Sequence, residues 1–461
     1  MKIVGIQKGA LLQRRGDTDS CDILLQADFC GKPQISMGEL SSAGENRWRL
    51  TGIPVGGPYS LTIRDDRERV TFADLYVGDL WLLAGQSNME GAGRMRECDW
   101  QDTENPMEDI RSFSMADLWE AAAPQLHRLW ESSDPAHQKT FAINRENHLK
   151  SGGLTADFPP AKQLRGVGPG YFFARELHRL TGVPQGVIPT AVGGAPIEMW
   201  TPPKTGEDNY FTAARRRVAA CGSHVRGIFW YQGEGYAGPL EEYTRRFEAM
   251  RHEITELFGE GGMLPCVQVQ TFRCTLDFLY QSEESRRAWS AFRNHQLVME
   301  ETLPNLVTVA NNDLDMDDCI HLSAASQETL GKRAALAMAK LVMNGGIGEP
   351  RVAEITAEPD EICPGWTNLS VKYKNVAGKL SSAGFPRGFT LALGDEEPSE
   401  VQIQHLELDG DRVVIRIELN REALKERTLW YGYGHNFACN ITDGLGRAIP
   451  SFGPVSLKNQ I

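Results

Sequence analysis

Short apolar runs alternate with longer stretches of helical periodicity between residues 76 and 345, and this alternation constrains the fold more than any other feature. The apolar runs have the length of strands and lie at 80–84, 186–192, 227–231, 264–271 and 306–310. The helical stretches lie at 170–181, 241–258, 283–301 and 324–344. Strands separated by helices require crossover connections, which build a parallel sheet with helices on both faces. The pattern therefore predicts an α/β fold with a three-layer α/β/α core domain.

The two ends of the chain have a different pattern. Residues 1–75 and 350–461 alternate apolar with polar residues between turn-forming residues, which is typical of half-buried β-strands. A chain of 461 residues is also too long for one compact core. We therefore expect an N-terminal β domain (1–75), a central domain (76–345) and a C-terminal β-sandwich-like domain (350–461).

A long polar segment at 92–165 interrupts the central pattern. It is rich in Trp, Asp and Pro, and its stretch 117–130 predicts a helix. Two interpretations are about equally compatible with this segment. It forms a wall of a binding pocket, or it is a surface insertion without function.

Composition excludes several classes of partner. The formal net charge of −13 argues against nucleic acid and against an anionic membrane surface, because both favour a basic surface. The 9 cysteines are odd in number and show no CxxC spacing, so we expect neither a zinc site nor a disulfide framework, and no cofactor motif occurs. No apolar leader or run of roughly 20 apolar residues occurs. The simplest expectation is a cytoplasmic protein, or a periplasmic or secreted one if a leader was removed, of unknown oligomeric state.

The first apolar run of the central domain ends in a serine turn, Gly85-Gln86-Ser87-Asn88-Met89-Glu90-Gly91. A serine at the end of a buried strand is presented outward, as a hydroxyl nucleophile must be. The alternative is an ordinary turn in which the serine caps a helix. Further polar groups follow other runs, at Gly193-Gly194, Gln232-Gly233-Glu234 and Asp318-Cys319-Ile320-His321. Because ligands bind at the carboxyl edge of parallel sheets, we expect these groups to meet there.

The residue types at this edge suit acyl transfer by a catalytic triad. Ser87 is the expected nucleophile and His321 the expected base, because a serine hydroxyl needs a base within hydrogen-bond reach. Asp318 is placed to orient the imidazole, with Asp317 and Asp315 as alternatives. The competing interpretation is an exposed histidine at the start of a helix, preceded by acids that favour its N-terminus.

Acyl transfer also needs donors for the developing oxyanion. A glycine permits close approach of its backbone, so the N–H of Gly194 is the natural donor and that of Gly193 the alternative. The carboxamide of Gln232 and the N–H of Ser87 are the other expected donors.

Motifs spread over the central domain carry a family resemblance. They are Val77-Gly78-Asp79-Leu80-Trp81 with Gly85-Gln86-Ser87-Asn88-Met89, Gly168-Pro169-Gly170-Tyr171-Phe172-Phe173, Val192-Gly193-Gly194-Ala195-Pro196, Trp230-Tyr231-Gln232-Gly233-Glu234 and Asp318-Cys319-Ile320-His321-Leu322. Together they resemble the sialate O-acetylesterase family, a branch of the SGNH hydrolase superfamily of serine esterases. The resemblance implies an SGNH-hydrolase core that removes O-acetyl groups from a carbohydrate, with O-acetylated sialic acid as the first choice of substrate. It also implies a triad of Ser87, His321 and Asp318, with Gly194 and Gln232 in the oxyanion hole.

The chain departs from the family pattern at two of these motifs. Gly235 and Tyr236 follow Glu234, where many members have Ser and Asn. Cys319 and Leu322 stand where many members have Asp and Pro.

Residues next to the motifs are candidates for contact with the sugar. They are Gln86, Asn88, Glu234 and Tyr236. Trp200, Trp230 and Tyr236 are also available to stack on a sugar ring, with packing in the core as the alternative and the favoured one for Trp230.

Two rival functions differ from a sialate esterase. One is an esterase for acetylated xylan or another polysaccharide, since the loops that select a sugar, such as 92–165, cannot be positioned from the sequence. The other is a non-catalytic carbohydrate-binding protein with β domains at both ends. The intact set of Ser87, Gly194, Gln232 and His321 argues against this second rival.

Overall fold

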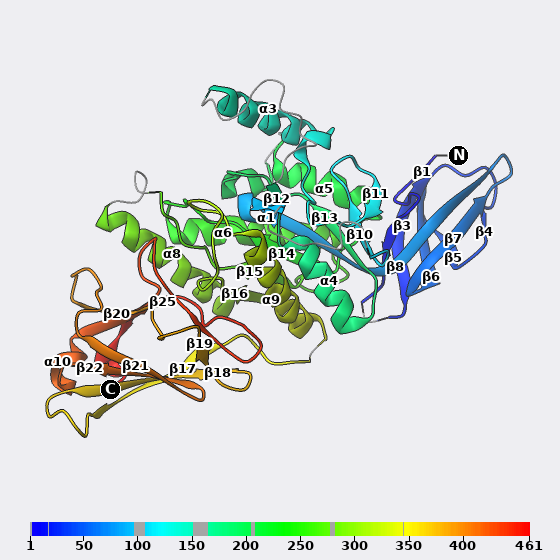
Figure 1. The fold of residues 1–461 in the computed structure, drawn as a ribbon. Coiled ribbons are helices and arrows are strands. Elements are labelled where there is room, and N and C mark those ends of the chain that lie inside the picture. Colours follow the sequence, from blue (N-terminus) through cyan, green and yellow to red (C-terminus); the bar gives the residue numbers. More distant parts are fainter. Residues whose placement is uncertain are drawn as a thin grey trace. The chain divides into compact units, whose positions relative to one another are not determined.

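The chain forms two compact units in the computed structural model, which describes residues 2–16, 18–95, 107–150, 165–203, 208–276, 282–343 and 345–461. The first unit comprises Met1–Gln232, Glu241–Cys266 and His321–Leu336, and the second comprises Gly233–Leu240, Val267–Ile320 and Ala337–Ile461. Helices accompany a central, largely parallel sheet, and further β-sheets occur towards both ends of the chain (Figure 1). The predicted α/β class is confirmed.

Strand β8 (Arg69–Gly85) is central to the sheet of the first unit (Figure 1). Two parallel strands flank its carboxyl half, β13 (Gln185–Pro189) and β14 (Gly227–Tyr231). The sheet continues from β13 to β10 (Ile110–Phe113), again parallel, and to β11 (Trp119–Ala121), which is antiparallel to β10. All residues of β13 and β14 are buried, as expected for parallel strands that are covered on both faces. This burial explains the apolar runs in the sequence.

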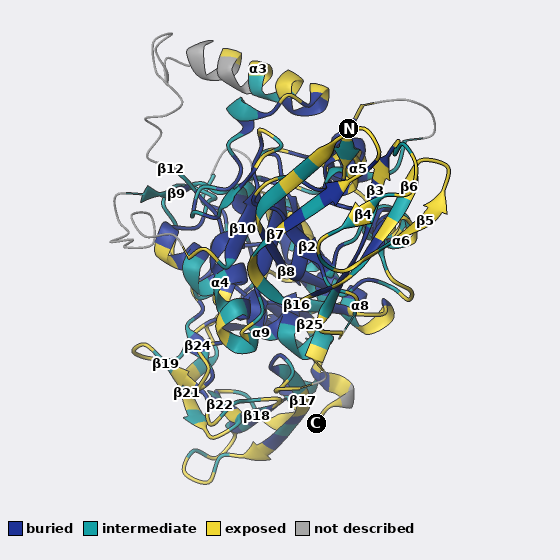
Figure 2. Ribbon diagram, turned by 90° about the vertical axis from the view of Figure 1, so that its right-hand side faces the viewer, coloured by how far each residue is buried: buried dark blue, intermediate teal, exposed yellow. Residues whose placement is uncertain are grey.

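The N-terminal β region shares strand β8. The first half of β8 pairs antiparallel with β7 (Gly56–Arg64), and its middle pairs parallel with β2 (Leu11–Gln13). The other strands of this region are β1 (Ile3–Val4), β3 (Ser20–Ala27), β4 (Gln34–Ile35), β5 (Glu39–Gly44) and β6 (Arg47–Pro54). Figure 2 shows the change from exposed strands such as β5 to buried β8. The boundary expected between residues 75 and 76 lies inside this unbroken strand.

The long helices follow the predicted ranges closely. α4 (Gly170–Thr181) has the predicted bounds and ends at Gly182, whose φ is 69°. α6 (Leu240–Phe258) begins one residue before the predicted range. α9 (Ala324–Met343) begins at the predicted residue, and the predicted last residue, Asn344, lies outside the described residues. Among the described residues before 232, the other helices are α1 (Ser87–Glu90), α3 (Pro135–Lys150) and α5 (Tyr210–Ala220), with 3-10 helices η2 (Leu129–Glu131) and η4 (Ile197–Trp200). A short antiparallel pair joins β9 (Gly93–Arg94) and β12 (Arg165–Val167).

The helix predicted at 117–130 is wrong. The segment forms β11 and η2, and it follows a turn in which Asp117 has a φ of 59°. The guanidinium of Arg217 on α5 donates to the carbonyls of Phe113 (2.6 Å) and Ser114 (2.8 Å) and pairs with Asp117. These contacts with a residue far away in the sequence favour the β10–β11 hairpin over the local helical pattern.

The second unit contains β15 (Cys266–Val269) from Val267 on, α8 (Glu283–Thr302), β16 (Leu306–Val309) and the C-terminal β region. One sheet of that region has the order β17-β18-β22-β21, formed by Arg351–Pro359, Thr367–Lys374, Arg412–Ile417 and Ile403–Asp409. Another has the order β20-β23-β25, formed by Phe389–Leu393, Arg427–Tyr431 and Phe452–Ser456. The smaller elements are β19 (Ser381–Ser382), β24 (Ile441–Thr442), α10 (Arg421–Lys425) and η5 (Leu457–Asn459).

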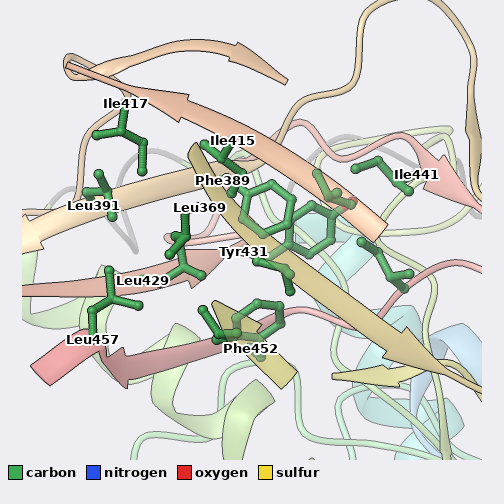
Figure 3. Packing of buried hydrophobic residues seen from close by; sticks show 14 of the residues in the cluster. Leu369, Phe389, Leu391, Ile415, Ile417, Leu429, Tyr431, Ile441, Phe452 and Leu457 are labelled. Atoms are coloured by element: carbon green, nitrogen blue, oxygen red, sulfur yellow. The ribbon is translucent and has the colours of Figure 1, made fainter. Parts of the chain in front are cut away.

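Side chains from both C-terminal sheets share one apolar core (Figure 3). Leu369 and Ile415 come from β18 and β22, and Phe389 and Tyr431 come from β20 and β23. Burial alternates along β18, so every second side chain enters the core. Two sheets of the C-terminal β region thus contribute to one core, and the sandwich-like domain stays a prediction.

Candidate active site

Ser87 follows the carboxyl end of β8 and opens the one-turn helix α1. Gly85 has a φ of 137°, and a Cβ atom there would lie only 2.0 Å from the carbonyl oxygen of Tyr231 on β14. Only glycine permits this approach. The N–H of Gln86 donates to the same carbonyl at 2.8 Å. Ser87 is half-buried, whereas Gln86 and Asn88 are buried, so the serine is accessible on a rigid support.

His321 approaches the serine hydroxyl within hydrogen-bond distance. Its Nε2 atom lies 2.9 Å from Ser87 Oγ, although the two residues are 234 positions apart in the sequence. Both belong to the first unit. A hydroxyl in contact with an imidazole is the geometry that nucleophilic catalysis requires.

Asn88 connects the serine turn with the histidine segment. Its Oδ1 atom accepts the N–H of Leu322 at 3.0 Å, and its carbonyl oxygen accepts a bond from Gln327 Nε2 at 3.1 Å. The side chain of Asn88 is fully buried. Asn88, the residue after Ser87, therefore fixes Leu322, the residue after His321. The contact of Asn88 with the sugar stays a prediction beside these two hydrogen bonds.

The loop after β13 packs directly against the serine. A Cβ atom at Gly193 would lie 3.7 Å from Ser87 Cβ and 3.0 Å from Glu90 Oε2. The N–H of Gly193 donates to that Glu90 oxygen. Gly194 has a φ of 71°, and nothing lies within 4 Å of a Cβ atom built on it. The loop is thus packed at Gly193 and open at Gly194.

Two backbone N–H groups beside this open space are unused. Within the described ranges, neither the N–H of Ser87 nor that of Gly194 donates a hydrogen bond. Unused N–H groups beside a nucleophile are the donors that an oxyanion needs.

Gln232 follows β14 and lies at the same edge of the sheet. Its Nε2 atom donates to Gln86 Oε1 at 3.2 Å and to the carbonyl of Ala195 at 3.3 Å. Its own carbonyl accepts the hydroxyl of Tyr243 at 3.2 Å. Gln232 and Gln86 are both buried. The Gln232 amide therefore links the serine turn to the loop after β13.

The remaining predicted site residues belong to the second unit. Asp318 accepts the N–H of Ile320 at 3.0 Å, and Asp315 lies 3.8 Å from Arg273. Glu234 is buried. The hydroxyl of Tyr236 donates to the carbonyl of Pro239 at 2.8 Å, and its ring packs on Phe292 with centroids 5.5 Å apart.

The two tryptophans considered for sugar stacking lie in the core. Trp200 and Trp230 are fully buried and pack edge to face, with ring centroids 5.4 Å apart. Trp230 also donates to the Tyr243 hydroxyl at 3.2 Å. Neither ring is exposed to a sugar. The prediction of core packing for Trp230 is confirmed, and the stacking role considered for Trp200 is wrong.

Glu90 is the site residue that the sequence reasoning missed. It is half-buried and lies three residues after Ser87 on α1, a spacing that places both side chains on one helical face. Burial raises the pKa of Glu90 to about 7, and the hydrogen bond from the Gly193 N–H lowers it only in part. The i to i+3 spacing from the serine was the available signal. Nothing in the sequence indicated the partner at Gly193.

The described ranges contain neither a candidate metal site nor a candidate membrane-spanning helix. No group of three or more His, Cys, Asp or Glu side chains there is arranged to hold a metal ion. No helix in the same ranges is long and apolar enough to cross a bilayer.

Comparisons with known proteins agree on one family. The family model "Carbohydrate esterase, sialic acid-specific acetylesterase" matches residues 77–340. The chain is 26% identical to the sialate O-acetylesterase of Pongo abelii over 255 residues, and 25% identical to that of Homo sapiens over 256 residues. Each match covers 48% of this chain and 44% of the relative, so it spans less than half the length of either relative.

A solved structure has a similar fold over nearly the whole chain. It is a carbohydrate acetylesterase from Xanthomonas citri, with a TM-score of 0.69 and 20% sequence identity. The match covers 97% of this chain and 98% of the other. At this identity the likeness concerns the fold.

Proposed function

Because this chain belongs to the carbohydrate esterase family of sialic acid-specific acetylesterases, we propose that it is a serine esterase that removes O-acetyl groups from a carbohydrate. The substrate that we propose first is an O-acetylated sialic acid. The observation that carries the proposal is the 2.9 Å distance between Ser87 Oγ and His321 Nε2 at the carboxyl edge of the sheet.

The proposed reaction proceeds through an acetyl-enzyme. Ser87 Oγ attacks the acetyl carbonyl carbon while His321 Nε2 takes the hydroxyl proton. The tetrahedral intermediate collapses, the ester bond to the sugar breaks, and the sugar oxygen leaves with the proton from His321. Water then attacks the acetyl-enzyme, with His321 again as the base. Acetate and free Ser87 are the products.

The oxyanion of the tetrahedral intermediate needs preorganised donors. We assign this role to the N–H groups of Ser87 and Gly194, a choice supported by the lack of any other acceptor for them within the described ranges. Gln232 is the third proposed donor. It would exchange its 3.3 Å bond to the Ala195 carbonyl for one to the oxyanion.

Asp318 is the residue that we propose to orient His321. Its position three residues before the histidine supports this role, and Asp317 and Asp315 are the alternatives. Gln86, Asn88, Glu234 and Tyr236 stay candidates for contact with the sugar.

Acetate release from defined substrates tests the proposal. We expect the enzyme to release acetate from 9-O-acetylated sialic acid faster than from acetylated xylan, and we expect Ser87→Ala to release none while keeping its circular dichroism spectrum. Faster release of acetate from acetylated xylan would be compatible with the serine mechanism, but it would replace sialic acid as the proposed substrate. Undiminished turnover in Ser87→Ala would refute the mechanism. Glycan binding without turnover in the unmodified enzyme would favour a binding protein.

A further inference from the structure

Glu90 holds the loop that carries the proposed oxyanion donor. Its Oε2 atom accepts the N–H of Gly193, and a Cβ atom at Gly193 would touch both Glu90 Oε2 (3.0 Å) and Ser87 Cβ (3.7 Å). Ser87 and Glu90 share the single turn of α1, whose last bond runs from the Gly91 N–H to the Ser87 carbonyl. The carboxyl group thus ties the loop after β13 to the helix that presents the nucleophile.

The neighbouring donor needs such a restraint. Gly194 has a φ of 71° and no contact within 4 Å of a Cβ position, so packing at that position does not fix its backbone. Glycine also has more conformational freedom than any other residue. The hydrogen bond at Gly193 fixes the peptide group that joins Val192 to Gly193, which is one residue before the peptide group that carries the Gly194 N–H. A loss of that bond would leave the Gly194 N–H free to turn away from the serine.

We infer that Glu90 is a positioning residue for acyl transfer: by binding the Gly193 N–H, it aligns the Gly194 N–H with the carbonyl oxygen of the ester that Ser87 attacks. This inference rests on the proposed esterase function. Glu90 touches neither substrate nor the reacting atoms in this role. Its effect falls on the transition state, because the oxyanion forms only there.

The role requires an acceptor atom and not a negative charge. Burial raises the pKa of Glu90 to about 7, so the site holds the uncharged carboxyl group over much of the acidic range. A glutamine has the same length and keeps a carbonyl oxygen for the Gly193 N–H. An aspartate keeps the carboxyl group but is one methylene shorter, so its oxygen cannot reach the Gly193 N–H in the same way.

Steady-state kinetics with p-nitrophenyl acetate on the full chain test the inference. We expect Glu90→Ala to lower kcat by roughly 10- to 100-fold with KM changed less than about 3-fold, somewhat less than for complete removal of an oxyanion donor. We expect Glu90→Gln to stay within about 3-fold of the unmodified enzyme. Glu90→Asp should resemble Glu90→Ala. The matched control is Glu176→Ala on α4, which removes a pair between half-buried Glu176 and exposed Arg179 and should leave kcat unchanged.

The variants separate positioning from folding. If Glu90→Ala does not fold, the pair Glu90→Asp and Glu90→Gln carries the same test, with low kcat expected for the first and near-normal kcat for the second. Equal loss in both would overturn the inference, and so would normal kcat in Glu90→Ala. An unmodified enzyme that does not cleave the ester would refute the proposed function, and the inference with it. If the unmodified enzyme is active and Ser87→Ala is inactive, the proposed function holds even where the Glu90 variants contradict the inference.

Discussion

Strands β14 and β18 are buried in different ways. Every residue of β14 is buried, whereas only every second residue of β18 faces a core. A strand that is covered on both faces leaves little room for exposed polar groups along its length. The polar groups of the first unit accordingly gather beyond the strand ends, at Ser87 after β8, Gly194 after β13 and Gln232 after β14.

This difference between the two regions predicts that catalytic activity and folding stability depend on different residues. Ser87, Gly194 and Gln232 lie beyond the strand ends of the first unit, carry the proposed chemistry and have no large apolar side chain to bury. The buried residues that alternate along the strands of the C-terminal β region form the core shown in Figure 3, and we propose no catalytic role for them. Substitutions in the two places should therefore change different measured quantities.

The largest expected effect is that of His321→Ala. It removes the proposed base, so we expect kcat/KM for p-nitrophenyl acetate to fall roughly 10³- to 10⁴-fold. Because His321 is half-buried, we expect the free energy of unfolding to change by no more than about 0.5 kcal/mol in urea denaturation. The exposed His405 on β21 offers the control His405→Ala, with both quantities unchanged. A kcat/KM of His321→Ala within tenfold of the unmodified enzyme would contradict this prediction.

The opposite result is expected for Leu369→Ala on β18. Leu369 is fully buried in the C-terminal core, and its truncation should lower the free energy of unfolding by about 2–5 kcal/mol. The kcat measured well below the unfolding transition should stay unchanged. The exposed Lys374 on the same strand provides the control Lys374→Ala. A loss of kcat in a folded Leu369→Ala protein would show that the two regions are not independent.

The smallest effect concerns a polar residue that is buried inside the first unit. Burial, together with the nearby charge of Arg217, lowers the pKa of His127 to about 3. The folded protein keeps this ring neutral below the ordinary histidine pKa of about 6.5, whereas the unfolded chain takes up a proton there. His127 therefore destabilises the fold as the pH falls below about 6.5, by up to about 1.4 kcal/mol per pH unit.

We expect His127→Leu to reduce this pH dependence. The slope of the free energy of unfolding against pH, measured by urea denaturation between about pH 6 and 4, should become flatter by roughly the same amount. His405→Leu replaces an exposed histidine and should keep the original slope. Equal slopes in His127→Leu and the unmodified protein would contradict the expectation.

Local patterns in the sequence predicted most of the regular elements. The predicted strand at 227–231 has the bounds of β14, and the predicted helix at 170–181 has those of α4. Both are long or strongly apolar segments with clear ends. The helix predicted at 117–130 failed because the Arg217 contacts, which no local pattern encodes, stabilise a hairpin.

The sequence by itself determined which residue types follow each strand, and so it pointed to Ser87 and His321, because strand ends and turn residues are local properties of a chain. Only the tertiary structure decided what the neighbours of those two residues do. Asn88 bonds to Leu322, Glu90 binds the N–H of Gly193, and Trp200 packs inside the core. Each of these outcomes depends on a partner that is distant in the sequence, and burial makes such polar partners necessary.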